Sequence, residues 1–336
     1  MTGLRDEAPQ TPPPRRPAPG EASATLRDVS SRTFDVVCLG ILVADVIARP
    51  VDSLPEPGTL ALVESITLRG GGCALNTSSA LAKLGLHAAA LGKVGDDAFG
   101  EFVLGLLAER GVADAGIVRD PAVPTSASVA LVDSAGERTF LHLKGANAAV
   151  RADELGASPF AGRALHVAGA LVLDALDGEP TAALLAEARR RGLHTSLDTV
   201  FDGSGRWERV LPALPHCDLV TPGLEEARAV TGERDPARAA ERLRELGAGV
   251  AAVTGGPEGC WVSGLGHVAA SPVEAVDGTG AGDAFAAGFL YGRLAGRPLD
   301  WCARFANAAG ALATTAVGAF EGVGDLSATL RLARLE

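Results

Sequence analysis

The sequence predicts an α/β protein in which a central, mostly parallel sheet is covered by helices on both faces. The first observation is the alternation of short apolar strands with helical stretches in the second half of the chain, because strands joined through helices pair in parallel. The second is the composition, since 336 residues of which 47% are hydrophobic can bury a large core. The third is a glycine-rich loop that leads into a helix near residue 280.

Charge and cysteine content exclude several classes of protein. The formal net charge of −11 argues against nucleic acid or an anionic membrane as a partner. The five cysteines are scattered without paired spacing, which is typical of reduced thiols and not of a disulfide framework or a zinc site. No apolar run is long enough to span a bilayer. These features predict a cytoplasmic protein.

Residues 1–33 differ from the rest of the chain. Prolines crowd between Pro9 and Pro19 and apolar residues are few, so the segment cannot bury enough surface to fold. It lacks the hydrophobic stretch of a secretory signal. We expect a disordered, Pro-rich N-terminal extension at 1–33 and one folded domain at 34–336.

The first half of the folded part is expected to hold a buried strand, a rim of short strands, two helices and a hairpin. The buried strand is predicted at 34–40, and prolines break the alternating pattern of 45–67 into short edge strands. A helix over 74–84 ends at Gly85, a natural helix stop. A strand at 88–94 precedes a helix at 98–110. Alternation at 126–132 and 138–143, around turn residues 133–137, predicts a β-hairpin.

The second half carries the βα alternation. Strands are predicted at 164–167, 194–197, 219–221 and 250–254, with helices that include 180–191 and 236–246 between them. Helices at 283–294, 299–316 and 325–335 close the chain. This alternation predicts a parallel sheet covered by helices on both faces.

The most informative motif is Asp277-Gly-Thr-Gly-Ala-Gly-Asp283. Glycines leave little side chain, so an anion can lie against the backbone, and free N–H groups at the helix start favour a phosphate. A phosphate would repel Asp283 unless that acid takes a proton from the hydroxyl that attacks it. A tight turn followed by an ordinary first-turn acid is the alternative interpretation of the same residues.

A second motif runs from Gly70 to Gly85, with the residues Gly70-Gly-Gly-Cys-Ala-Leu-Asn76 at its start. The glycines let the backbone approach a ligand, and the amide of Asn76 can donate to and accept from a sugar hydroxyl. By itself this motif favours a structural turn with a local hydrogen bond from Asn76.

Together the two motifs resemble the signatures of the PfkB, or ribokinase-like, carbohydrate kinases, in the family's order and about two hundred residues apart. One residue departs from the commonest form, Gly278 where Thr is usual. The resemblance covers about 34–325. It implies a three-layer ribokinase-like fold with a central, mostly parallel sheet flanked by helices. It also implies a small β-sheet lid over the sugar site, with strands from about 45–67 and 126–143.

The resemblance also implies roles for individual residues. Asp283 matches the catalytic base, and the backbone of Gly280, Ala281 and Gly282 matches the anion hole that stabilises the transferring phosphoryl group. Asp45 matches the acid that binds sugar hydroxyls, since one carboxylate can accept two of them. The remaining sugar contacts are matched by Gly71, Gly72 and Asn76.

On the nucleotide side, the turn after the strand at 250–254 matches a segment that contacts ATP. The matching residues are Thr254, Gly256 and Gly259, with Asn307 near the adenine.

The metal assignments rest on weaker matches. Glu226, in Thr221-Pro-Gly-Leu-Glu-Glu226, matches the acid that organises Mg²⁺, but Gly223 replaces the usual Asn. Many members bind a monovalent cation such as K⁺ at the positions of Asp277, Thr279 and Gly318.

These matches predict an ATP-dependent kinase that phosphorylates a hydroxyl group of a small polyol, with a sugar as the first expectation. The alternatives are a nucleoside kinase and a catalytically weak nucleotide- or sugar-binding regulator. The departure at Gly223 motivates the regulator, whereas the intact Asp283 argues against it. We also expect the protein to form a homodimer through the lid strands.

Overall fold

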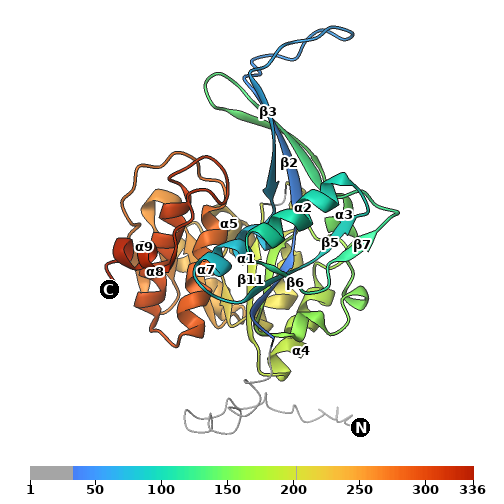
Figure 1. Cartoon of the computed structure of the whole chain (residues 1–336). Coiled ribbons are helices and arrows are strands. Elements are labelled where there is room, and N and C mark those ends of the chain that lie inside the picture. The colour runs from blue at the N-terminus through green and yellow to red at the C-terminus, as the bar shows by residue number, and fades with distance from the viewer. Residues whose placement is uncertain (1–32, 202) are drawn as a thin grey trace, which may run out of the picture. The chain divides into compact units, whose positions relative to one another are not determined.

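The structure, a computed structural model, describes residues 33–201 and 203–336 (Figure 1). Apart from Thr33, the predicted Pro-rich extension at 1–33 lies outside the described residues. The central sheet has nine strands in the order β15-β14-β13-β12-β11-β10-β1-β4-β6. Its strands are β1 (Phe34–Gly40), β4 (Ala88–Leu91), β6 (Ala113–Asp114), β10 (Gly162–Ala170), β11 (His194–Thr199), β12 (Leu219–Val220), β13 (Val250–Thr254), β14 (Cys260–Val262) and β15 (Gly266–Val268).

Neighbouring strands from β6 to β13 are parallel, and β13, β14 and β15 are antiparallel. The predicted parallel sheet is therefore confirmed for the centre of the fold. The antiparallel edge made by β14 and β15 was not expected from the sequence.

Helices cover both faces of this sheet. Alternate residues of β1 belong to two separate cores: Val36 shares one with Phe289, and Val37 shares the other with Leu185. The helices of the first core are α1 (Cys73–Lys83), α2 (Ala98–Glu109), α7 (Ala281–Leu294) and α8 (Leu299–Ala313); those of the second are α4 (Glu179–Arg190), α5 (Leu224–Thr231) and α6 (Pro236–Glu245). Helix α9 (Leu326–Ala333) packs on α8, and the short α3 (Gly145–Ala149) follows the lid. The resulting helix–sheet–helix layers are the expected architecture.

The strand predicted at 88–94 is two strands. β4 ends at Leu91, and β5 (Lys93–Gly95) pairs with β7 (Val118–Asp120) in a separate two-stranded sheet. At Gly92 a Cβ atom would lie 2.7 Å from the carbonyl oxygen of Gly40. The chain therefore breaks at a glycine that the close approach of another backbone requires.

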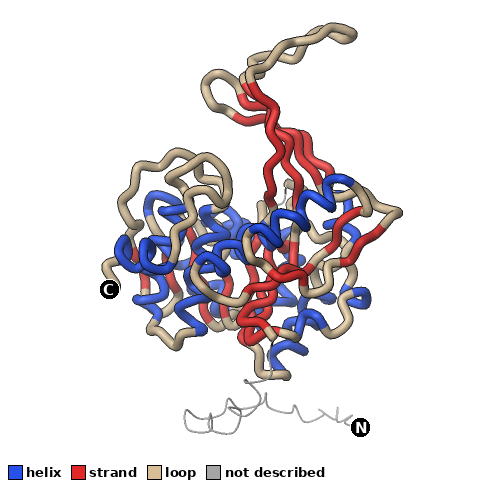
Figure 2. The backbone as a smooth tube through the Cα atoms, viewed as in Figure 1, coloured by secondary structure: helices blue, strands red, loops and turns tan. Residues whose placement is uncertain are grey.

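The lid is a four-stranded sheet in the order β3-β2-β8-β9, made of β3 (Ser65–Gly71), β2 (Val43–Arg49), β8 (Ala127–Val132) and β9 (Arg138–Leu143). β8 and β9 form the predicted hairpin, and β2 pairs with β8 in parallel. These strands extend beyond the helices of the main layers in Figure 2. No helix among the described residues is long and apolar enough to cross a membrane.

The two faces of the lid differ in chemistry. Directly paired residues share a face and adjacent residues alternate. One face carries the row Arg69, Asp45, Ser128 and His142, and the other carries the row Leu68, Val46, Val129 and Leu141. The lid therefore has one polar and one apolar face.

Candidate active site

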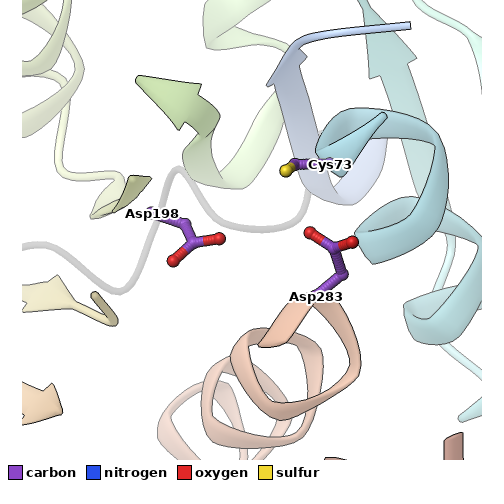
Figure 3. A group of neighbouring side chains, drawn as sticks. All are labelled: Cys73, Asp198 and Asp283. Atoms are coloured by element: carbon purple, nitrogen blue, oxygen red, sulfur yellow. The ribbon is translucent and has the colours of Figure 1, made fainter. Parts of the chain in front are cut away.

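Acidic side chains gather where the central strands end. Asp198 lies near the end of β11, and Glu226 lies in the first turn of α5, directly after β12. Figure 3 shows Asp198 and Asp283 directed toward one another and toward Cys73. One ligand atom from each of these three side chains lies within 4.8 Å of the others. The site therefore joins segments of the chain that are far apart in sequence.

Helix α7 places Asp283 with little freedom. Gly280, at the helix start, has φ of 77°, and a Cβ atom there would lie 2.7 Å from the carbonyl oxygen of Ala319. Glycine is required by both constraints. Asp283 is the third residue of the helix and only 8% exposed. Asn76 Nδ2 donates a 2.8 Å hydrogen bond to Asp283 Oδ2, so the two predicted motifs meet at this carboxylate.

Burial raises the pKa of Asp283, and hydrogen bonds from Asn76 and the Cys73 thiol oppose the rise. A raised pKa makes a carboxylate a better proton acceptor. The other amide atom, Asn76 Oδ1, is buried and has no hydrogen-bond partner within the described chain. A hydroxyl group beside Asp283 would supply that partner.

Asp198 and Glu226 make the site strongly electronegative. Thr221 Oγ1 lies 3.2 Å from Asp198 Oδ1, and Thr199 Oγ1 donates to Glu226 Oε2 at 2.5 Å. Burial is the main cause of the raised pKa of both carboxyl groups; for Asp198 the charges of Glu226 and Asp283 add to it. Among the described residues, no lysine or arginine neutralises these two acids or Asp283.

The loop before α7 has the features of an anion hole in part. The N–H of Ala281 is directed to the carbonyl of Gly278 at 3.2 Å. The next N–H groups at a helix start have no acceptor in their own helix, and no heavy atom outside its immediate chain neighbours lies within 4 Å of a Cβ position on Gly282. Gly278 has the same open surroundings, so the Thr of the commoner motif would fit there.

The predicted sugar contacts lie where the lid meets α1. A Cβ atom on Gly71 would collide with the carboxylate of Asp45, and one on Gly72, whose φ is +94°, would collide with the carbonyl oxygen of Ile41. These glycines therefore make room for the carboxylate and for the start of α1. Burial raises the pKa of Asp45, and Ser128 and His142 oppose the rise.

Two lid residues extend this network from Asp45 into the hairpin. Ser128 is hydrogen-bonded to Asp45, and Ser128 Oγ lies 3.0 Å from His142 Nδ1. Alternation along the hairpin could place Ser128 and His142 on one face, but only the pairing of β2 with β8 brings them to Asp45.

On the expected nucleotide side, Thr254 ends β13 and forms a bridge with Gly223. Gly256 has φ of +57° and open surroundings, so the backbone is accessible to a ligand. Gly259 is required for a different reason, since a Cβ atom there would lie 2.5 Å from the backbone nitrogen of Ala270. Asn307 donates both amide hydrogens to the carbonyls of Val268 and Ala269, at 3.0 and 2.9 Å. Its contacts thus hold the segment after β15.

The acids Asp198 and Glu226 suit a hydrated Mg²⁺, because hard carboxylate oxygens are its preferred ligands. Burial is the main cause of their raised pKa values, and neighbouring carboxylates add negative charge that such an ion would offset. The N–H of Gly223 donates to Glu226 Oε2 at 2.9 Å, which orients the carboxylate. The backbone at Gly223 therefore provides one of the contacts that position Glu226.

The residues predicted for a monovalent cation do not fit one. Asp277 Oδ1 accepts from Thr279, and Asp277 Oδ2 accepts from Gly318 N at 2.9 Å and pairs with Arg138 Nη2 at 2.8 Å. Burial alone would raise the pKa of Asp277, but the hydrogen bonds from Arg138, Thr279 and Gly318 outweigh it and hold that pKa well below the ordinary range. Both carboxylate oxygens are already engaged.

A family model described as the pfkB family carbohydrate kinase matches residues 33–323. The chain belongs to this family. The kinase is 36% identical to a fructokinase of Klebsiella pneumoniae over 272 residues, 74% of this chain and 87% of that protein. It is 30% identical to a fructokinase of Vibrio alginolyticus over 304 residues, 84% and 95% of the two chains.

The fold agrees with the family. A solved ribokinase of Arabidopsis thaliana, complexed with ribose and ATP, matches the structure with a TM-score of 0.78 at 22% identity. The match covers 90% of this chain and 99% of that one. The protein is accordingly an ATP-dependent carbohydrate kinase, and the predicted ribokinase-like fold is confirmed.

Proposed function

We propose that this kinase transfers the γ-phosphoryl group of ATP to a hydroxyl of a small sugar that binds between Asp45 of the lid and Asp283 of α7. The observation that carries the proposal is the contact between Asn76 and Asp283. It places a buried carboxylate of raised pKa beside an amide oxygen that still lacks a hydrogen-bond donor. Two neighbouring hydroxyls of one sugar can donate to these two acceptors.

The side chain of Asp283 takes the proton from the attacking hydroxyl, whose oxygen then bonds to the γ-phosphorus while the bond to the β-γ bridging oxygen breaks. The carboxylate is in a suitable environment, because burial makes it a stronger base than an exposed aspartate. The first N–H groups of α7, around Gly282, lie beside the base and favour the charge that develops on the phosphoryl oxygens.

We assign the sugar to the polar face of the lid. Asp45 accepts the hydroxyls remote from the reacting one, and Ser128 and His142 hold its carboxylate in place. Fructose is the first sugar to test, because similar proteins from Klebsiella pneumoniae and Vibrio alginolyticus are fructokinases.

We assign the nucleotide to the turn that contains Thr254 and Gly256, next to Gly223. In this arrangement Glu226 and Asp198 bind a Mg²⁺ that travels with ATP. When bound, that ion offsets the charge of the acids and polarises the phosphates. Asn307 acts indirectly, by fixing the segment after β15. The five free cysteines support a reducing compartment, the cytoplasm, as the place of action.

We also propose that the kinase is a homodimer through its lid. The face opposite Asp45 is apolar and exposed, with Leu141 65%, Ile66 68% and Leu143 50% accessible. A two-fold dimer lets this patch meet its own copy. Light scattering should report a dimer for the natural chain and a monomer for Leu141→Lys. A natural chain that is monomeric at micromolar concentration would contradict the proposal.

The decisive experiment is coupled detection of ADP with a panel of sugars, sugar acids, inositols and nucleosides. We expect turnover with at least one sugar and much less with nucleosides. Turnover with a nucleoside alone would show a nucleoside kinase. ATP binding without turnover on any member of the panel would favour a binding regulator.

A further inference from the structure

Arg138 connects the lid to the glycine-rich loop. It is the first residue of β9, and its side chain is 35% exposed. Nη2 pairs with Asp277 Oδ2 at 2.8 Å, and Nη1 donates to Thr279 Oγ1 at 2.7 Å. One guanidinium therefore binds two residues of the loop that leads to Gly280, through the planar, forked geometry that suits arginine.

The contact with Arg138 compensates the negative charge of the Asp277 carboxylate. This carboxylate lies before the anion hole, where an unbalanced negative charge would repel the phosphoryl oxygens. Asp277 Oδ1 is bound by Thr279, and Asp277 Oδ2 also accepts from the N–H of Gly318, so the carboxylate ties two loops together. The side-chain charge that faces it is that of Arg138.

We propose that Arg138 is the built-in cation of this loop, so that the guanidinium takes the place of a monovalent ion and the kinase works without added K⁺. The inference rests on the proposed phosphoryl-transfer site. It differs from the expectation for Asp277, Thr279 and Gly318, because the positive charge comes from the protein's own lid.

The position of Arg138 also couples the charge to the lid. Arg138, Phe140 and His142 alternate along β9 and share the face that carries Asp45. A second lid arginine, Arg69, pairs with Glu321 at 2.8 Å, in the segment that follows Gly318. A lid that moves away from the loop would remove the guanidinium from Asp277. The loop is thus neutralised only when the lid is in place over the sugar site.

The test compares the natural chain with Arg138→Gln, which keeps much of the length and loses the charge. Turnover is measured with K⁺ and with tetramethylammonium at equal ionic strength. We expect the natural chain to respond to K⁺ by less than about twofold, whereas Arg138→Gln loses about tenfold without K⁺ and recovers part of it when K⁺ is added. Arg69→Gln is the matched control, since it breaks the other lid contact and leaves Asp277 paired; its rate should not depend on K⁺.

Thermal unfolding gives a readout that needs no sugar. K⁺ should leave the Tm of the natural chain unchanged. It should raise the Tm of Arg138→Gln by roughly 2 °C or more, because only in the variant does the carboxylate of Asp277 lack a cationic partner. Strong K⁺ activation or stabilisation of the natural chain would overturn the proposal, and so would an Arg138→Gln variant indifferent to K⁺ in both assays. Failure to phosphorylate any sugar, with the thermal result intact, would count against the proposed function alone.

Discussion

The edge of the main sheet and the lid contribute to one site in opposite ways. At the sheet edge Asp283 is 8% and Asp198 is 6% exposed, and each is held by a helix start or a strand end that is packed in the core. On the lid Phe140 is 56% exposed; the lid strands β2 and β3 contact α1 and α2, and Arg138 of β9 forms an ion pair with Asp277 of the glycine-rich loop. If the proposed function is correct, the reacting groups are fixed by the core, whereas sugar recognition depends on a more exposed sheet that an ion pair links to the glycine-rich loop.

The largest expected effect is on the packed side. Asp283→Asn removes the base but keeps the size and one hydrogen-bond acceptor, so turnover should fall by about 10²–10⁴-fold or more while ATP binding is kept or tightened. Coupled ADP release measures the turnover, and calorimetric titration with nucleotide measures ATP binding. Asp153→Asn, at an exposed aspartate that pairs with Arg151, is the matched control. A variant with more than half of the natural turnover would refute the role of Asp283.

Substitutions at the lid residues that face the proposed sugar site should change the KM for the sugar and leave the KM for ATP nearly unchanged. Asp45→Ala removes a charge-assisted contact of about 1.5–3 kcal/mol, which is roughly 10- to 100-fold in the sugar KM, with little change in the KM for ATP. Ser128→Ala should have a smaller effect of the same kind, since it only orients the carboxylate. A loss of ATP affinity in Asp45→Ala, with the sugar KM unchanged, would mean that the two substrates occupy exchanged places.

A third test concerns the dependence of the rate on Mg²⁺, which we propose to be bound at the sheet edge. Glu226→Ala should raise the Mg²⁺ concentration for half-maximal rate by about tenfold and slow turnover. Gly223→Asn should lower that concentration. The structure has room for it, because the nearest atoms to a Cβ on Gly223 lie 3.5 Å away and its φ of −66° is ordinary. An unchanged Mg²⁺ profile in Glu226→Ala would place the metal elsewhere.

The smallest expected effect concerns stability. The folded-state pKa of Asp198 is raised, first by burial, so between the ordinary value and this raised pKa the folded chain binds a proton that the unfolded chain does not. The ligand-free protein should therefore gain stability as the pH falls from neutrality through this raised pKa toward the ordinary value of 3.8. Asp198→Asn should raise the Tm at neutral pH by roughly 2 °C or more and reduce this pH dependence. A lower Tm for the variant, measured by calorimetry without nucleotide, would contradict the charge argument.

Local patterns predicted most of the fold. Apolar periodicity located β1, β13 and the helices α2, α4, α6, α7, α8 and α9 within a few residues. The two glycine motifs located Asp283 and Asn76, because each motif is contiguous and contains a glycine, Gly72 or Gly280, that close backbone atoms require. The split at Gly92 was missed, since the cause is the backbone of Gly40, fifty-two residues earlier in the chain.

The rest of the site depends on register and strand order. Cys73 and Asp198 meet Asp283 only because β11 and the starts of α1 and α7 share one edge of the sheet. The contact of Arg138 with Thr279 spans 141 residues. No local pattern contains such contacts, because they follow from pairings between distant segments. The roles assigned to the nucleotide-side residues and to Glu226 remain predictions from the family resemblance and the geometry.

The glycines of the two motifs should differ in how they tolerate substitution, and this bears on saturation mutagenesis of the enzyme. Gly72 and Gly280 have positive φ and face backbone atoms that cannot retreat, so we expect every replacement to be selected against; a replacement at Gly71 would displace the carboxylate of Asp45. A Cβ at Gly70 would meet only the tip of Leu106, which can rotate away, and Gly278 faces open space. A library screened for growth on the substrate sugar should therefore recover variants at 70 and 278, whereas 72 and 280 should stay glycine.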